Sequence, residues 1–393
     1  MFIERSLLAE LRAMMALYPV VTVIGPRQSG KSTLVRQAYP ELPYVSLEDP
    51  DERWMAVSDP RAFLARFPNG VILDEIQQQP HLLSYIQGIV DAKKQKGLFL
   101  LTGSHQLALH AAISQSLAGR TAVLKLLPLS LQELTHQTAG WSMVQHLLAG
   151  GYPSVCAQEM PVLKFYRDYI QTYLERDVRT LSHVQDLVAF QQFMRFCAGH
   201  TGQVIHYENF SNALGISVTT VKNWLSILEA SFIVFRLSPY YEHFGKRIRK
   251  AQKLYFFDTG LACYLSNITD VTQLQSHPLR GGLFENLVIL EIYKHYLHQG
   301  IEPYLYFFRE SNENEVDLLI QQGHQFIPIE IKSSQTFHSD FLKGLRYFKK
   351  IAKERCRAGF LVYTGTQTQA LDTFALVNFK NLEAVYGASA EKG

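Results

Sequence analysis

The chain has 393 residues, which at about 150 residues per domain predicts two to three domains. Hydrophobic residues make up 47% and charged residues 19% of the sequence, values typical of globular proteins, so a disordered chain and a coiled coil are excluded. The net charge of +3 is too small to indicate nucleic-acid binding by itself.

The N-terminus and the cysteines indicate the compartment. Charges at Glu4 and Arg5 stand where a secretory signal has its hydrophobic run, and no stretch approaches the roughly 18 apolar residues of a membrane helix. The cysteines have the spacing of neither a zinc knuckle nor a disulfide framework, so we expect them reduced and buried. They are Cys156, Cys197, Cys263 and Cys356. We therefore expect a cytoplasmic protein with no membrane partner.

A phosphate loop is predicted directly after the first strand. Residues 19–24 form an apolar, β-branched run of strand length, and a helical pattern covers residues 33–38. The intervening sequence matches the motif G-x-x-x-x-G-K-[ST]. Its residues are Gly25, Pro26, Arg27, Gln28, Ser29, Gly30, Lys31, Ser32 and Thr33. In this motif backbone N–H groups surround a phosphate chain, Lys31 reaches the β- and γ-phosphates, and the Ser32 hydroxyl binds Mg²⁺. The sequence therefore predicts a site for ATP and Mg²⁺.

Acidic and hydroxyl side chains end the next two predicted strands. Asp74 and Glu75 follow the apolar residues 71–73, and Thr102 and Ser104 follow residues 98–101. A phosphate-loop ATPase needs an aspartate for the magnesium water shell and a residue that orients the attacking water, the roles predicted for Asp74 and Glu75. The pattern alone leaves an alternative for each pair. Asp74 and Glu75 could be an acidic strand end followed by a helix N-cap, and Thr102 and Ser104 could belong to a simple turn after a strand.

The middle of the chain predicts a winged helix-turn-helix. Helical patterns cover residues 186–197, 207–214 and 217–230, with a tight turn at Gly215, and residues 233–237 and 253–257 predict two strands. The loop between these strands is basic, which suits contact with nucleic-acid phosphates. Its candidate contact residues are Lys246, Arg247, Arg249 and Lys250. Packing against another protein and a merely solvated hairpin remain alternatives.

The C-terminal part predicts an acidic cluster with a lysine. Glu285 lies in the first turn of a predicted helix at residues 283–298, Asp317 on a strand at 315–320, and Glu330 and Lys332 on a strand at 326–332. A hairpin brings Asp317 beside Glu330. This order of residues resembles the PD-(D/E)XK nuclease core, in which carboxylates hold Mg²⁺ and the lysine acts at the scissile phosphate. An amphipathic hairpin in solvent is the alternative, and the basic helix at 343–357 is a second candidate for phosphate contact.

The N-terminal motifs resemble one group of bacterial and archaeal AAA+ ATPases. The phosphate loop, the Asp-Glu strand, the strand ending in Leu-Thr-Gly-Ser and the sequence 116–120 carry the resemblance. In that group the ATPase is fused to a domain resembling restriction endonucleases. The resemblance implies that Thr102 or Ser104 is the first sensor residue and that Arg120 is an arginine finger offered to a neighbouring subunit, so the protein would be a homo-oligomer. It also implies a helical lid over the nucleotide.

These observations predict a multidomain α/β protein. The expected domains are an AAA+ P-loop core at residues 1–127 with a parallel sheet, a helical lid at 128–182, a winged helix-turn-helix at 183–262 and a restriction-endonuclease-like α/β domain at 263–393. The expected function is ATP hydrolysis in the service of nucleic acid, with DNA favoured, and a Mg²⁺-dependent endonuclease-like domain. Two rivals stay open: a nucleotide-gated binding switch with an inactive nuclease-like domain, and a protein-remodelling ATPase.

Overall fold

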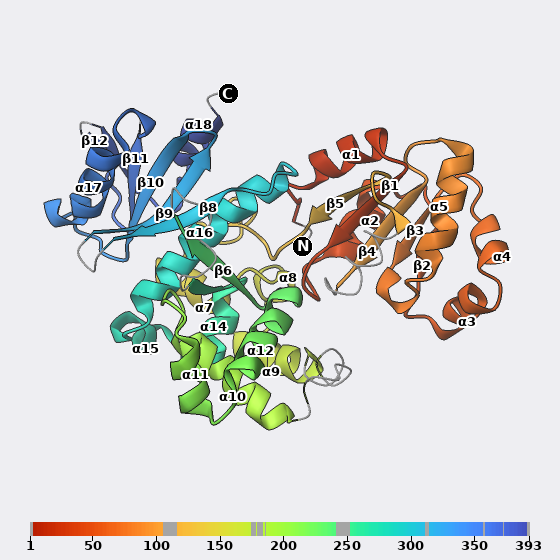
Figure 1. Ribbon diagram of the computed structural model, residues 1–393, viewed down its shortest axis with the longest axis horizontal. Helices are drawn as coiled ribbons and strands as arrows, with labels where there is room; N and C mark the ends of the chain where they lie inside the picture. The colour runs from red at the N-terminus through yellow and green to blue at the C-terminus, as the bar shows by residue number, and fades with distance from the viewer. Residues whose placement is uncertain are drawn as a thin grey trace. The chain divides into compact units, whose positions relative to one another are not determined.

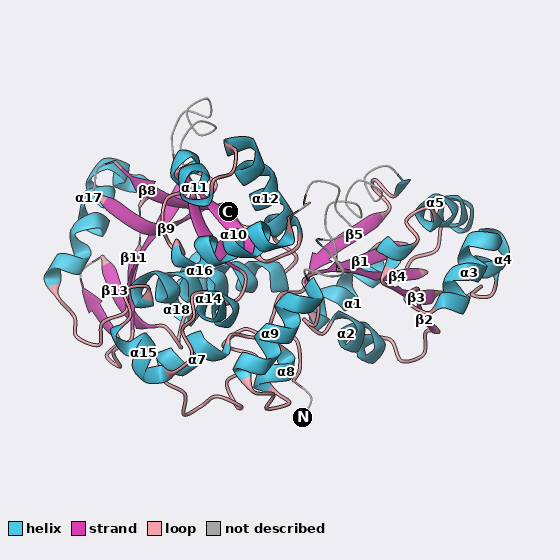
Figure 2. Cartoon of the chain, turned by 90° about the horizontal axis from the view of Figure 1, so that it is seen from below, coloured by secondary structure: helices cyan, strands magenta, loops and turns pink. Residues whose placement is uncertain are grey.

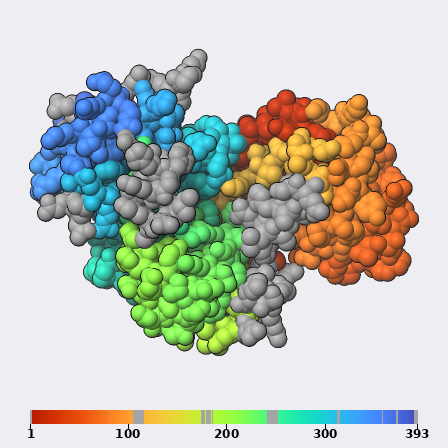
Figure 3. All heavy atoms as spheres, viewed as in Figure 1, coloured from red at the N-terminus to blue at the C-terminus, as the bar shows by residue number. Residues whose placement is uncertain are grey.

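The chain divides into two compact units. The computed structural model describes residues 3–104, 116–173, 178, 184, 186–240, 252–310, 314–356, 358–371 and 373–390. Unit 1 contains residues 1–129 with 230–232 and 297–301, and unit 2 contains the remaining residues. Figure 3 shows the atoms of residues 3–104 in red to orange as one filled body, and those of the C-terminal half in green to blue.

Unit 1 is built on a parallel sheet with the strand order β2-β3-β4-β1-β5 (Figure 1). Its strands are β1 (Val20–Ile24), β2 (Tyr44–Ser46), β3 (Val71–Asp74), β4 (Phe99–Gly103) and β5 (Thr121–Lys125). Its helices are α1 (Leu8–Leu17), α2 (Lys31–Ala38), α3 (Pro50–Ser58), α4 (Pro60–Ala65) and α5 (Leu82–Lys93), with a short 3₁₀ turn, η1 (Ile76–Gln78). Figure 2 shows α1 and α2 on one face of this sheet and α5 on the other. Apolar side chains of α1 and α2 form a core with Val21 and Val23 of β1, and every residue of this interior strand is buried.

The register of unit 1 brings the predicted motifs to one edge. Ile24 at the end of β1 pairs with Gly103 at the end of β4, and Leu73 of β3 pairs with Leu101 of β4. Because the three strands are parallel, their carboxyl ends meet at the same edge of the sheet. The phosphate loop, the Asp-Glu pair and the residues after β4 therefore lie together.

The first part of unit 2 is helical. Its helices are α7 (Met143–Ala149), α8 (Pro153–Cys156), α9 (Val162–Tyr173), α10 (Leu187–Gly199), α11 (Tyr207–Leu214), α12 (Val218–Ala230), α14 (Thr259–Leu265), α15 (Val271–Ser276) and α16 (Arg280–His298). Gly215, at φ 64°, ends α11, and the Ser217 hydroxyl accepts the N–H of Thr220 at 3.0 Å, which caps α12. Trp224 of α12 is buried against Phe190 and Phe193 of α10. Helices α11 and α12 are thus joined by a tight turn, and α12 packs on α10 through aromatic side chains.

Unit 2 also contains a sheet with the order β12-β13-β11-β10-β9-β8-β6-β7. The strands are β6 (Val234–Pro239), β7 (Lys253–Phe256), β8 (Leu305–Arg309), β9 (Glu315–Gln322), β10 (Gln325–Lys332), β11 (Gly359–Tyr363), β12 (Gln369–Leu371) and β13 (Phe374–Asn378). The last helices are α17 (Lys343–Ala352), which packs on β9 and β10, and α18 (Glu383–Ala390), with 3₁₀ turns η3 (Ser339–Leu342) and η4 (Lys353–Arg355).

Strands from two predicted domains share this sheet. Ser238 of β6 pairs with Tyr306 of β8, so the strands predicted for the winged segment continue the sheet of the C-terminal segment. The basic residues predicted between β6 and β7 lie outside the described residues. The winged helix-turn-helix therefore stays a prediction. Among the helices that the structure describes, none has the length and apolar character needed to cross a membrane.

Candidate functional site

The loop between β1 and α2 is shaped around two glycines and a buried lysine. A Cβ on Gly25 would lie 2.1 Å from the carbonyl oxygen of Leu126, so only glycine fits there. Gly30 takes φ 94° at the start of α2, a conformation that favours glycine. Lys31 is 4% exposed, and its Nζ donates to the carbonyl oxygens of Gly25 at 3.0 Å and Pro26 at 2.8 Å. The lysine therefore bridges the loop that the motif predicts.

Arg5 supports this loop from the N-terminal segment, a contact that the sequence did not reveal. Its guanidinium is buried and donates through Nη1 to the carbonyl oxygen of Ser29 at 2.7 Å and through Nη2 to that of Leu127 at 2.6 Å. Ser29 is buried as well. Arg27 is half-buried, while Gln28, at φ 59°, and Thr33 are exposed. Arg5 therefore links the phosphate loop at Ser29 to the segment after β5 at Leu127 through hydrogen bonds from its charged guanidinium.

Asp74 is the centre of the predicted magnesium site. Its Oδ2 accepts the Ser32 hydroxyl at 2.9 Å and the Tyr44 hydroxyl at 2.5 Å, and its Oδ1 accepts the Thr102 hydroxyl. Burial and the hydrogen bond to Asp74 raise the pKa of Tyr44. The structure thus brings together Ser32, Asp74 and Thr102, and it adds Tyr44. One hydroxyl and one carboxylate are oxygen donors that fit Mg²⁺, which commonly takes few protein ligands and completes its shell with water and phosphate oxygens.

Glu75 has a strained backbone. It lies at φ 57° and ψ 48°, the left-handed region that side chains other than glycine rarely adopt. Its Oε2 accepts the Ser104 hydroxyl at 3.0 Å and the side-chain amide of Gln77, and its N–H donates to the Thr102 hydroxyl at 3.2 Å. Strain of this kind costs about 1–3 kcal/mol and clusters at functional positions. In this conformation Glu75 lies next to Thr102 and Ser104, the residues predicted to sense the γ-phosphate.

Arg120 is paired within its own chain. Its guanidinium forms two hydrogen bonds to Asp91 of α5, Nε to Oδ1 at 2.6 Å and Nη2 to Oδ2 at 2.9 Å. Because Thr121 of β5 pairs with Val20 at the start of β1, Arg120 lies at the end of the sheet away from Gly25. Five residues of strand, about 16 Å at 3.3 Å each, separate the two ends. Arg120 therefore does not reach the phosphate loop of its own chain.

The β9–β10 hairpin places the second predicted cluster. Gly323 turns at φ 57°, and Leu318 pairs with Ile329, which sets Asp317 close to Glu330. Asp317 Oδ2 accepts the N–H of Ile331 at 2.8 Å. Lys332 Nζ lies 2.5 Å from Glu330 Oε1 and 3.6 Å from Asp317 Oδ2. Both carboxylates are 8% exposed.

Glu330 is the group in this cluster that fits a cation. Burial and the neighbouring Asp317 carboxylate raise the pKa of Glu330 to about 8. Its Oε2 is buried and has no hydrogen-bond partner among the described residues. A Cβ on Gly344 of α17 would lie 3.4 Å from this oxygen and 2.0 Å from the carbonyl oxygen of Glu315, so the helix approaches closely only because this residue is glycine. A buried carboxylate oxygen without a donor is stabilised by a hard cation.

Glu285, predicted as a metal ligand, is bound by a lysine and a tyrosine. Its Oε1 accepts Lys253 Nζ at 2.8 Å and the Tyr255 hydroxyl at 2.5 Å, and burial raises its pKa to about 7. Lys253 is 4% exposed and also contacts Glu315 Oε1 at 2.7 Å. In the part of the chain that the structure describes, no three His, Cys, Asp or Glu side chains are arranged to hold a metal. Asp317 and Glu330 alone would therefore supply protein ligands, with Glu285 paired to a lysine that the sequence did not single out.

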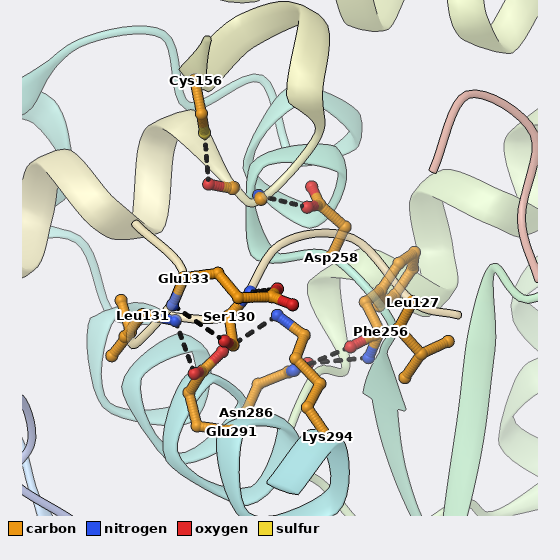
Figure 4. Close-up of polar contacts among 12 residues, drawn as sticks. Leu127, Ser130, Leu131, Glu133, Cys156, Phe256, Asp258, Asn286, Glu291 and Lys294 are labelled. Atoms are coloured by element: carbon orange, nitrogen blue, oxygen red, sulfur yellow. Dashed lines mark hydrogen bonds and ion pairs between the residues drawn. The ribbon is translucent and has the colours of Figure 1, made fainter. Parts of the chain in front are cut away.

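A buried polar network anchors residues 130–173 within unit 2 (Figure 4). Asp258 Oδ2 accepts the N–H of Gly151 at 2.7 Å, and Glu291 accepts the N–H of Leu131 at 2.7 Å and Lys294 Nζ at 2.9 Å. The Gly151 N–H, in the segment predicted as a lid, is thus bound to a carboxylate rather than offered to a phosphate. The four cysteines are free and buried, as expected.

Three family descriptions match successive parts of the chain. Residues 17–135 match "AAA domain", residues 140–272 match "Domain of unknown function (DUF8612)", and residues 280–382 match "Domain of unknown function (DUF4143)". Together with the loop and the Asp-Glu strand, the first match defines a P-loop ATPase of the AAA class. The restriction-endonuclease-like part of the predicted resemblance is not among these descriptions.

Two mycobacterial relatives match most of the chain. It is 31% identical over 344 residues to the uncharacterized proteins Rv2008c of Mycobacterium tuberculosis and Mb2031c of Mycobacterium bovis, covering 86% of this chain and 75% of each relative. The chain belongs to the family of these proteins. Among solved structures, the Walker-type ATPase PABY2304 of Pyrococcus abyssi is similar at 15% identity and a TM-score of 0.43, covering 67% of this chain and 96% of that one. AMPPCP-bound DnaA from Aquifex aeolicus is similar at 13% identity and a TM-score of 0.30, covering 58% and 89%.

Proposed function

We propose that the protein hydrolyses ATP with Mg²⁺ as a homo-oligomer in the cytoplasm, acts on nucleic acid, and carries a nuclease-like site at Asp317, Glu330 and Lys332. The observation that carries the ATPase part is the hydrogen-bond network at Asp74 and Glu75. It joins the phosphate-loop serine to two strand ends that are far apart in sequence.

The roles in hydrolysis follow from these contacts. Ser32 and Asp74 would hold Mg²⁺, which when bound neutralises charge on the β- and γ-phosphates. Lys31 would leave the two carbonyl oxygens that it now contacts for a phosphate oxygen, a stronger acceptor because it is charged. Glu75 would orient and deprotonate the attacking water, and Thr102 with Ser104 would hold Glu75 in place.

The nuclease-like site is supported by the unpartnered oxygen of Glu330 beside Asp317. These two carboxylates would hold Mg²⁺, which when bound lowers the pKa of a water molecule and makes it a nucleophile at neutral pH. Lys332, within reach of both carboxylates, would then turn its ammonium toward the scissile phosphate and stabilise its developing negative charge.

A second candidate function has its own observation. Lys332 lies beside Glu330 and Asp317, and Lys253 lies beside Glu285 and Glu315, so each carboxylate of the cluster already has a protein cation next to it. These ion pairs offset part of the negative charge without a metal ion. Under this alternative the C-terminal domain docks a partner without cutting, and the ATPase acts as a nucleotide-gated switch.

The proposed arginine finger has a direct test. We expect the Arg120→Ala variant to bind ATP like the wild type and to hydrolyse it about 10³-fold more slowly, because the finger stabilises only the transition state. Mixing Arg120→Ala with Glu75→Gln should restore part of the activity, since some interfaces then combine an intact arginine with an intact glutamate. Asp91→Ala is the control, because it removes the intramolecular partner and leaves the finger. A protein that stays monomeric with ATP and hydrolyses it at full rate would contradict the trans arrangement.

Nucleic-acid binding is tested by retention on DNA at increasing salt. We expect the wild-type protein to be retained at low salt, and the double variant Arg247→Ala with Lys250→Ala to bind more weakly with a salt slope smaller by about one per lost phosphate contact. The matched control is Lys94→Ala with Lys96→Ala, which removes the same charge from exposed positions in unit 1. Wild-type protein that elutes without retention at low salt would favour a protein-remodelling ATPase.

A further inference from the structure

A groove with a volume of about 860 Å³ lies in unit 2 at the ends of three strands. Strands β10, β11 and β13 are parallel to one another. Residues that directly follow each of them line the groove: Ser333 after β10, Thr364 after β11 and Phe379 after β13. The carboxyl ends of parallel strands are where ligands bind in α/β sheets, and the volume is within the range of ligand sites. The position and size of this groove are those of a binding site.

The lining of the groove is cationic and rich in neutral polar groups. It contains Arg280 and Lys380 and no aspartate or glutamate. Arg280 Nη1 donates to the carbonyl oxygen of Gln275 at 2.7 Å, and Lys380 Nζ to that of Trp141 at 2.5 Å. Within the described residues neither cation pairs with a carboxylate, so both positive charges remain for a ligand. The remaining polar groups are hydroxyls and amides, the neutral groups that proteins use on phosphate oxygens.

The groove adjoins the acid–lysine cluster through two elements. Ser333, in the groove, directly follows Lys332 at the end of β10. Arg280, at the start of α16, is five residues before Glu285, an axial distance of about 7.5 Å in a helix. A chain of phosphates lying in the groove would therefore lie at the end of β10 that carries Lys332.

We propose that this groove binds the sugar–phosphate backbone of a nucleic-acid strand and delivers it to the cluster of Asp317, Glu330 and Lys332. Arg280 and Lys380 contact the phosphates, and Trp141, which is half-buried in the lining, offers its ring to a base or sugar. The assignment rests on the proposed action on nucleic acid, and it adds a contact surface to the basic residues predicted between β6 and β7.

The test is the affinity of the full-length protein for a fluorescein-labelled single-stranded DNA, measured by anisotropy at several salt concentrations. We expect Arg280→Gln with Lys380→Gln to bind at least about tenfold more weakly, with a salt slope smaller by about 1.4, which is 0.7 for each of two lost contacts. ATPase activity and the melting temperature should equal those of the wild type. The comparison variant is Lys343→Gln with Lys350→Gln, which removes two exposed charges from α17, the other candidate for phosphate contact. If the groove is the contact surface, this variant should bind like the wild type.

Three outcomes would overturn the assignment. If all proteins bind DNA equally, nucleic-acid binding stands and the groove is not its surface. If the α17 variant loses affinity and the groove variant does not, the strand lies on α17. If wild-type protein binds no DNA at low salt, while inorganic phosphate shifts its melting temperature through Arg280 and Lys380, the groove is a small-anion site and the proposed action on DNA fails with it.

Discussion

The Glu75→Gln variant is expected to bind ATP like the wild type and to hydrolyse it about 10²- to 10⁴-fold more slowly, the usual contribution of a general base. Glutamine keeps the shape of the side chain and a carbonyl oxygen for the Ser104 hydroxyl, so the local hydrogen bonds survive. It removes the negative charge that orients and deprotonates water, which matters only in the transition state. The measurement is phosphate release at saturating ATP beside binding of a fluorescent ATP analogue.

The Lys31→Ala variant should lose ATP binding, whereas Glu75→Gln should lose only hydrolysis. The ammonium contacts phosphate in the ground state, and a charge-assisted hydrogen bond of about 1.5–3 kcal/mol corresponds to roughly 10- to 150-fold in affinity. The loss of the bridge to Gly25 and Pro26 also loosens the loop, so binding itself should fail. The control for the removal of an acid in Glu75→Gln is Glu41→Gln, at an exposed position of the same unit. Equal turnover by Glu75→Gln and wild type would remove Glu75 from the role of base.

The prediction of a P-loop ATPase from sequence is confirmed by the AAA domain match. It could be made because the loop residues are contiguous and because two buried strands end in the polar residues that the chemistry needs. Tyr44 and Arg5 could not be found in this way. Each is a single polar residue without a motif, and each reaches the site only because the fold brings β2 and the N-terminal segment to the loop.

The second site shows the same limit more strongly. Asp317, Glu330 and Lys332 could be predicted together because one hairpin with a turn at Gly323 holds them, and hairpin pairing is a local property. Lys253 comes from β7, which is joined to this sheet through the pairing of β6 with β8. The alternation of apolar and polar residues predicts that a strand exists, but it does not predict which strand from a distant part of the sequence lies beside it. The ion pair that occupies Glu285 was therefore invisible in the sequence.

That ion pair changes what we expect from Glu285. Removing this carboxylate by Glu285→Ala leaves the buried Lys253 with Glu315, and breaking a buried pair costs about 3–5 kcal/mol. The expected result is a lower melting temperature with little direct effect on metal affinity. Glu285→Gln should lose less stability, because the amide oxygen still accepts from Lys253 and Tyr255. A large loss of Mg²⁺ affinity in a Glu285→Gln protein of normal stability would instead make Glu285 a ligand.

The largest effects at this site are expected from the two strand carboxylates. Asp317→Ala or Glu330→Ala should abolish both binding of Mn²⁺ or Mg²⁺, measured by titration calorimetry, and metal-dependent cleavage of DNA or RNA, because one hard cation shares their oxygens. Lys332→Ala should keep the metal and slow cleavage about 10²- to 10³-fold, since its charge acts on the phosphate. This variant should bind the metal more tightly than wild type, because the ammonium that lies 2.5 Å from Glu330 Oε1 no longer competes for it.

The substrates for this test are single-stranded, duplex and branched DNA, and RNA, each with and without ATP. ATPase activity should survive all of these substitutions, because none of the altered residues belongs to unit 1. The Lys332→Ala variant separates the two candidate functions without relying on cleavage. If it binds no metal, the lysine and the carboxylates form a structural ion-pair cluster, and the domain is a docking surface. If it binds Mn²⁺ more tightly than wild type while Glu330→Ala binds none, the cluster is a metal site in which Lys332 and the cation compete for the same oxygens.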